Sequence, residues 1–323
     1  MPDVSELSLA KRDLLEKYLR GDIPPTDMAP NTHPVPAQEV SDSDGPRPAV
    51  VTVQKGGARL PVFYIHIHAE GGAFYCFNLA RDLGPEQPFY VLEPFKSAEM
   101  RALPSFEAMA AAYVRSLRAV QPEGPYQLVG FCGGGLIAFE MAQQLRKQGQ
   151  AVEALVLIEP RAGPDWFRMI RPKLVVSSIR GLGALLRLRP EQQAGVFLLL
   201  LHLYRLLTVR VLHRATYHEM HAKGLLNLPL VPGTDLLRQN WIGLFVWSAS
   251  HYRPHPYPGK LIYLWSREEP SNQRAGKWGN VTRAKTVEVC FMPGDQTTCR
   301  TTHLAALAQH LRRYLSERDA GGA

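Results

Sequence analysis

Short apolar runs and longer segments with helical spacing alternate along most of this chain. Six runs are short and continuous, as is typical of parallel strands covered on both faces. They are Pro61–Ile65, Phe89–Leu92, Gln127–Val129, Ala154–Ile158, Leu261–Leu264 and Val287–Phe291. Between them, apolar residues recur at helical spacing after Ser105, from Ile137 to Leu145 and from Leu304 to Leu315. This order predicts an α/β fold with a mostly parallel, doubly wound sheet.

Two segments depart from this alternation. Residues 1–48 hold one short helical pattern, Leu7–Gly21, and then a stretch rich in Pro, Asp, Ser and Thr, and we predict that they form a linker. From about residue 165 to 252 the chain is Leu-rich and basic and shows no strand pattern. We interpret this segment as a helical lid inserted above the carboxyl ends of the strands, within a folded domain of residues 49–323.

Composition narrows the classes of function. The chain has 323 residues, of which 46% are hydrophobic, enough for one large core. Its longest apolar run, Val196–Leu212, is interrupted by His202, Tyr204 and two arginines, so no membrane span is expected. The net charge of +8 is concentrated in the predicted lid, which argues against a nucleic-acid partner. Four scattered cysteines predict free thiols in a reducing compartment, and hence a cytoplasmic protein.

The most specific motif is Gly130-Phe131-Cys132-Gly133-Gly134. It follows a predicted strand and precedes a predicted helix, which is the context of a nucleophile elbow, a sharp turn that presents a nucleophilic side chain. A cysteine at a helix N-terminus also gains thiolate character, which is the reactive form. The alternative is a buried structural cysteine in a glycine-rich turn. A phosphate loop is excluded because no Gly-Lys-Ser/Thr follows.

The segment Gly124–Gly149 resembles the thioesterase domains that end nonribosomal peptide and polyketide synthases, which usually carry Ser where this chain has Cys132. The resemblance covers roughly residues 49–160 and 250–316 and is weak in the predicted lid. It also rests on Pro61–His66, Asn78–Gly84, Val156–Pro160 and Pro293–Asp295.

This resemblance implies an α/β-hydrolase fold and a thioesterase activity. The enzyme would release or cyclise an acyl, peptidyl or polyketide chain through a Cys132 acyl-enzyme. The chain would arrive as a thioester on the phosphopantetheine arm of a carrier-protein domain, so no intrinsic cofactor is expected. The resemblance is also compatible with a place in a larger synthase.

The resemblance further implies partners for the nucleophile. The triad acid matches Glu159, which would orient an imidazole, although a Glu that merely caps a strand end is the alternative. The oxyanion donors would be the backbone N–H of Gly133 and a second group near His68 or Ala69, of which we assign Ala69. No Cys, Asp or Glu spacing completes a zinc site with His66 or His68, so no metal is expected.

At the position of the triad histidine, which serves as the general base, this chain departs from the family pattern. The family usually reads Gly-Asp-His near its end, whereas this chain reads Gly294-Asp295-Gln296, and Gln does not exchange a proton near neutral pH. We predict His303 as the base, because a deletion near Thr297–Thr302 would shift it toward the vacated position. The alternative is that His303 only packs or caps the last helix.

Three functions therefore stay open at the level of sequence. The first is an active cysteine thioesterase. The second is a catalytically impaired, thioesterase-like binding module, which the missing His favours. The third is a stand-alone editing hydrolase, against which the linker-like first segment argues. The basic lid either recognises an acidic carrier domain or is simply a solvated face.

Overall fold

The structure is a computed structural model that describes residues 48–67, 74–94, 104–160, 172–212, 241–250, 252–268 and 286–315. All of them belong to one unit of the chain, residues 44–323. All of the predicted linker except its last residue, Pro48, lies outside the described residues. Ala69, the loop residue His68 and most of the segment that joins the lid helices also lie outside them.

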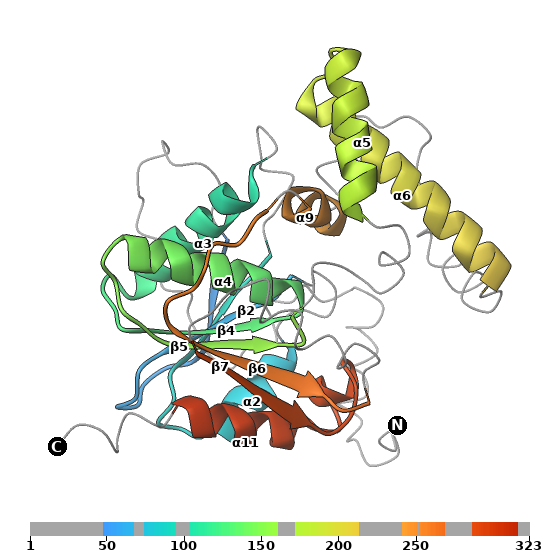
Figure 1. Ribbon diagram of the computed structural model, residues 1–323. Helices are drawn as coiled ribbons and strands as arrows, with labels where there is room; N and C mark the ends of the chain where they lie inside the picture. Colours follow the sequence, from blue (N-terminus) through green and yellow to red (C-terminus); the bar gives the residue numbers. More distant parts are fainter. Residues whose placement is uncertain are drawn as a thin grey trace, which may run out of the picture. The chain divides into compact units, whose positions relative to one another are not determined.

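Seven strands form one sheet in the order β1-β3-β2-β4-β5-β6-β7 (Figure 1). Their bounds are β1 Val50–Gln54, β2 Val62–Ile65, β3 Phe89–Leu92, β4 Tyr126–Phe131, β5 Val152–Ile158, β6 Lys260–Ser266 and β7 Thr286–Met292. Strand β1 pairs with β3 in antiparallel register, and the other five neighbouring pairs are parallel. The prediction of a mostly parallel α/β sheet is confirmed.

Helices cover both faces of the sheet (Figure 1). Their bounds are α2 Phe74–Leu83, α3 Phe106–Val120, α4 Gly133–Lys147 and α11 Leu304–Leu315. Helices α3 and α4 contribute to one hydrophobic cluster, while α2 and α11 contribute to a second cluster on the opposite face. Helix α3 begins where the sequence predicts, because the Ser105 side chain accepts a hydrogen bond from the Ala108 N–H at 3.1 Å. Strands β2 and β4 are buried throughout.

The described part of the predicted lid is helical and contains no strand. It comprises α5 Pro172–Leu185, α6 Pro190–Leu212 and α9 Trp241–Ala249. Helix α9 joins the core through the buried Leu244, Phe245 and Val246, whereas α5 exposes Leu182 and Leu185. Among the helices described, none is long and apolar enough to cross a membrane.

The two outer strands differ from the sequence expectation. The run Val287–Phe291 predicts a strand buried on both faces, but in β7 Val287, Val289 and Phe291 are 36%, 38% and 42% exposed. The reason is that β7 is an edge strand, so that only its Glu288 and Cys290 side contacts α11. Strand β1 is missing from the predicted strands, because its Val-Val-Thr-Val-Gln sequence forms no continuous apolar run.

Candidate active site

The Cys132 elbow is a strained turn between two buried elements. Strand β4 ends at Phe131, Cys132 follows with φ 53° and ψ −121°, and α4 begins at Gly133. A positive φ is unfavourable for a residue with a Cβ and is held only where the surroundings fix it. Here the Cys132 N–H donates to the Ile158 carbonyl of β5 at 2.8 Å, and the Gly135 N–H donates to the Cys132 carbonyl at 3.1 Å. The thiol is therefore fixed at the N-terminus of α4.

Glycines around Cys132 permit close approach of the backbone. A Cβ on Gly134 would lie 2.2 Å from the Ile65 carbonyl oxygen at the end of β2. A Cβ on Gly130 would lie 2.5 Å from the Gly135 Cα. Such separations are impossible, so β2, β4 and the first turn of α4 can meet only because these positions lack side chains.

The surface beside the elbow is apolar. A Cβ on Gly133 would lie 2.3 Å from Ile67 Cδ1 and 3.0 Å from Phe245 Cε1, so these two side chains cover that residue. Gly133 lies at the first position of α4, where backbone N–H groups have no partner within the helix. An oxyanion donor at Gly133 is compatible with this position, whereas its predicted companion Ala69 lies outside the described residues.

Glu159 is a buried carboxylate next to the elbow. It follows β5 with φ 45°, and its side chain is fully buried. The Ser266 N–H donates to Glu159 Oε1, and the Glu159 N–H donates to the Leu264 carbonyl at 3.0 Å. A buried carboxylate is tolerated only when hydrogen bonds or charges compensate it. The structure thus places Glu159 inside the protein at the carboxyl ends of β5 and β6, and not on the surface.

His303 lies in the segment that follows β7. Its half-buried ring packs against Gly294, where a Cβ would lie 2.4 Å from His303 Cδ2. The backbone N–H of His303 donates to the Thr298 carbonyl at 2.8 Å. Backbone N–H groups of Thr298 and Thr297 hold the Asp295 pKa below its usual value, and the nearby His303 charge acts in the same direction. The imidazole is therefore close to the Asp295 carboxylate, at the same edge of the sheet as Cys132.

The predicted site residues thus fall into two groups. Cys132, Gly133 and Glu159 lie together at the ends of the neighbouring strands β4 and β5. His303 comes from the segment after β7, which lies two strands beyond β5 in the strand order. Gln296, at the usual position of the base, is half-buried, and its carbonyl accepts hydrogen bonds from Cys299 Sγ and Arg300 Nε.

Sequence reasoning missed Cys299, Ser266 and Arg300. Burial raises the pKa of Cys299 to about 12, and the Glu159 carboxylate acts in the same direction, which places this thiol beside the acid. Ser266 supplies the backbone donor to Glu159. These residues belong to no recognised motif. Ser266 reaches Glu159 because β6 pairs with β5, and Cys299 and Arg300 lie in the short 3-10 helix after β7.

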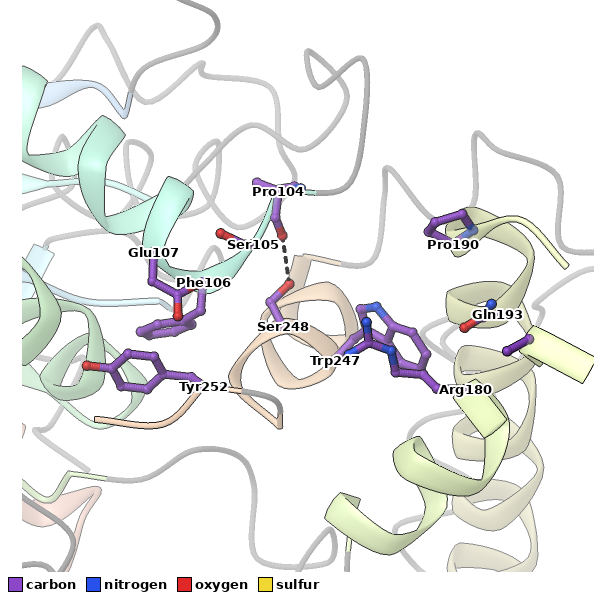
Figure 2. A pocket seen from close by; sticks show the side chains of 11 residues that line it. Pro104, Ser105, Phe106, Glu107, Arg180, Pro190, Gln193, Trp247, Ser248 and Tyr252 are labelled. Atoms are coloured by element: carbon purple, nitrogen blue, oxygen red, sulfur yellow. Dashed lines mark hydrogen bonds between the residues drawn. The ribbon is translucent and has the colours of Figure 1, made fainter. Parts of the chain in front are cut away.

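A separate pocket lies between α3, α9 and the helices α5 and α6, with a volume of about 410 Å³. Phe106, Trp247 and Tyr252 line it, and Arg180 lies at its α5 side (Figure 2). Phe106 also stacks edge-on against Phe245, with ring centroids 5.8 Å apart. Phe245, which covers Gly133, therefore also contacts Phe106 in the wall of this pocket.

Fold and elbow together define the class of the protein. A seven-stranded, mostly parallel sheet with a strained Cys at the strand-to-helix turn is the arrangement of an α/β-hydrolase fold. The sequence model of the thioesterase domain family matches residues 61–174, a stretch that includes Cys132 and Glu159. Residues 61–174 are therefore similar to the thioesterase domains found in nonribosomal peptide and polyketide synthases.

Two curated relatives come from Bacillus subtilis (strain 168). A dimodular nonribosomal peptide synthase is 33% identical over 135 residues, which cover 41% of this chain and 6% of that protein. The polyketide synthase PksR is 33% identical over 113 residues, which cover 35% of this chain and 4% of that protein. The chain therefore spans only a small part of the length of these relatives.

Solved structures share the fold at lower identity. A four-domain nonribosomal peptide synthetase has a TM-score of 0.55 at 21% identity, over 83% of this chain and 20% of that chain. The NocB thioesterase domain, in covalent complex with a fluorophosphonate nocardicin G analogue, has a TM-score of 0.50 at 22% identity, over 83% of this chain and 98% of that domain.

Proposed function

We propose that the chain is a cysteine thioesterase that acts through an acyl-enzyme on Cys132. The Cys132 sulfur attacks the thioester carbonyl, a new carbon–sulfur bond forms, and the original thiol leaves. Water, or an amine or hydroxyl of the acyl chain itself, then attacks the acyl-Cys132 carbonyl. The carbon–sulfur bond to Cys132 breaks, the attacking group loses its proton, the Cys132 thiol is restored, and the free acid or the ring is released. The observation that carries this proposal is the strained Cys132 at the N-terminus of α4.

The elbow supplies what acyl transfer requires. The N-terminal end of the α4 dipole favours the thiolate, and thiolate is the nucleophile. The tetrahedral intermediate needs donors aimed at its oxygen, and the Gly133 N–H is the donor that we assign in the described residues. Because a thiol is partly ionised near pH 7, acylation of a Cys depends less on a base than acylation of a Ser.

The pocket and the relatives support a carrier-bound acyl substrate. Phe106, Trp247 and Tyr252 offer apolar surface for an acyl chain, and Phe106 contacts Phe245, which covers Gly133 of the elbow. The relatives named above are multidomain synthases, in which the phosphopantetheine arm would come with a carrier domain rather than with this chain. The exposed Arg187 and Arg189 fit an acidic carrier surface.

Gln296 keeps a second candidate open. With Gln at the usual position of the base, a thioesterase-like module could bind acyl chains without turnover. Intact-protein mass spectrometry separates the two functions. Incubation with acyl-pantetheine thioesters, free and carrier-bound, should add the mass of one acyl group, and peptide mapping should locate it on Cys132. Binding without a covalent adduct would support the module, and an adduct on Cys76, Cys290 or Cys299 would contradict our assignment.

Replacing His303 with alanine tests the base. If His303 accepts the proton of the attacking group, His303→Ala should accumulate acyl-Cys132 and slow its release by about a hundredfold, while acylation changes less. The measurement is the time course of the acyl adduct after a single addition of thioester. The matched control is His310→Ala, since His310 is also half-buried and lies on α11. If the acyl group leaves Cys132 at the same rate in His303→Ala and in the parent protein, His303 has only a structural role.

A further inference from the structure

Arg300 lies beside the residue that precedes the nucleophile. Its guanidinium carbon is 4.8 Å from the centre of the Phe131 ring and 5.5 Å from the centre of the Tyr75 ring. Its Nε donates to the Gln296 carbonyl at 3.4 Å. Two aromatic faces and one hydrogen bond therefore hold the guanidinium in place.

This position adjoins the elbow through Phe131 and through Cys299. Phe131 and Cys132 are consecutive, so their Cα atoms are about 3.8 Å apart. Cys299, the neighbour of Arg300 in the chain, packs in the same hydrophobic cluster as Phe131 and Cys132. The short 3-10 helix Thr298–Arg300 thus brings a permanent positive charge to the elbow, because a guanidinium stays protonated at any pH that the protein tolerates.

The charge of Arg300 already acts on other thiols nearby. Burial raises the pKa of Cys76 and that of Cys299 to about 12 each, and Arg300 acts in the opposite direction on both. The other titratable or charged groups described around the elbow are His66 after β2, Tyr75 on α2, Glu159 after β5, the exposed Arg267 after β6, and Asp295 and His303 before α11.

We propose that Arg300 is the electrostatic partner that keeps the Cys132 sulfur in its thiolate form. This inference rests on the proposed role of Cys132 and adds a residue that acts on it. A cation beside a thiol favours the charged sulfur, and on Cys299 the Arg300 charge already opposes that of Glu159. Arg300 acts through Cys132 and needs no contact with substrate.

The test is the ionisation of Cys132 itself. The ultraviolet absorbance of the thiolate is followed against pH in the parent protein and in Arg300→Met. For each protein, the same titration of a variant that also carries Cys132→Ala is subtracted, so that the difference reports Cys132 alone. Loss of the Arg300 charge should raise the midpoint of the Cys132 transition by about one pH unit. The acid limb of kcat/KM for a pantetheine thioester should move in the same direction. The titration needs no substrate, so it stands even if the thioesterase proposal fails.

Three further variants separate charge from packing. Arg300→Gln, a second neutral change, should shift the midpoint as Arg300→Met does, whereas Arg300→Lys should keep it close to the parent value. The matched control is Arg313→Met, because Arg313 lies 5.5 Å from the Tyr314 ring on α11 and should leave Cys132 unchanged. A midpoint that stays at the parent value in both neutral variants, or that moves equally in Arg300→Lys, would overturn the proposal.

Discussion

Cys132→Ala is expected to reduce turnover of thioesters by about a thousandfold or more and to abolish the covalent adduct. Removing the nucleophile leaves only binding and oxyanion stabilisation, which give a small residual rate. The fold should persist, since alanine has a smaller side chain and keeps the backbone hydrogen bond from residue 132 to Ile158. The measurements are kcat/KM with an acyl-pantetheine substrate and the intact mass of the protein.

Cys290→Ala is the control for this change. Cys290 lies on the edge strand β7, is less buried than Cys132, forms no disulfide, and contacts Tyr314 of α11. Its loss should leave both adduct and turnover near the parent values. Turnover that survives Cys132→Ala but disappears in Cys290→Ala would reverse the assignment of the nucleophile.

Gly134→Ala is expected to destabilise the protein and to disable the elbow together. The new Cβ would meet the Ile65 carbonyl oxygen at 2.2 Å, and because that atom belongs to the backbone, β2 or α4 must shift. Overpacking of this kind costs about 1–3 kcal/mol, more than alanine gains from its helix propensity. Tm should fall by several degrees, and acylation of Cys132 should slow, in calorimetry and adduct time courses.

Gly181→Ala is the matched change in an open position. Gly181 lies within α5, and a Cβ there meets nothing within 4 Å. Alanine should therefore raise stability by up to about 1 kcal/mol and leave acylation unchanged. If Gly134→Ala has the same Tm and the same rate of acylation as Gly181→Ala, the close packing of β2 against α4 is required neither for stability nor for the reactivity of Cys132.

Local patterns predicted those parts of the structure whose causes are local. The elbow follows from five consecutive residues, and the start of α3 follows from Ser105 as N-cap. The parallel strands were readable because burial on both faces requires continuous apolar runs. Strand β7 was misread for the same reason, since its run resembles a covered strand while its edge position depends on the order of the whole sheet.

The surroundings of the nucleophile could not be read in this way. Ser266 lies 107 residues from Glu159 in the chain, and nothing in the sequence indicates that its N–H meets that carboxylate. Arg300 reaches Phe131 only because a short 3-10 helix after β7 packs against α2 and β4. The roles of Glu159 and His303 stay predictions, because they depend on side-chain geometry during the reaction.

Helix α9 divides the molecule into parts that can diverge at different rates. Phe245 and Trp247 are two positions apart, so they point to roughly opposite sides of the helix, one covering Gly133 and the other facing Phe197 and the pocket (Figure 2). Substitutions on α5 and α6 can thus reshape the pocket without disturbing the residues that hold Cys132. A lineage of such proteins could change the acyl chains that it accepts while its reaction chemistry stays constant.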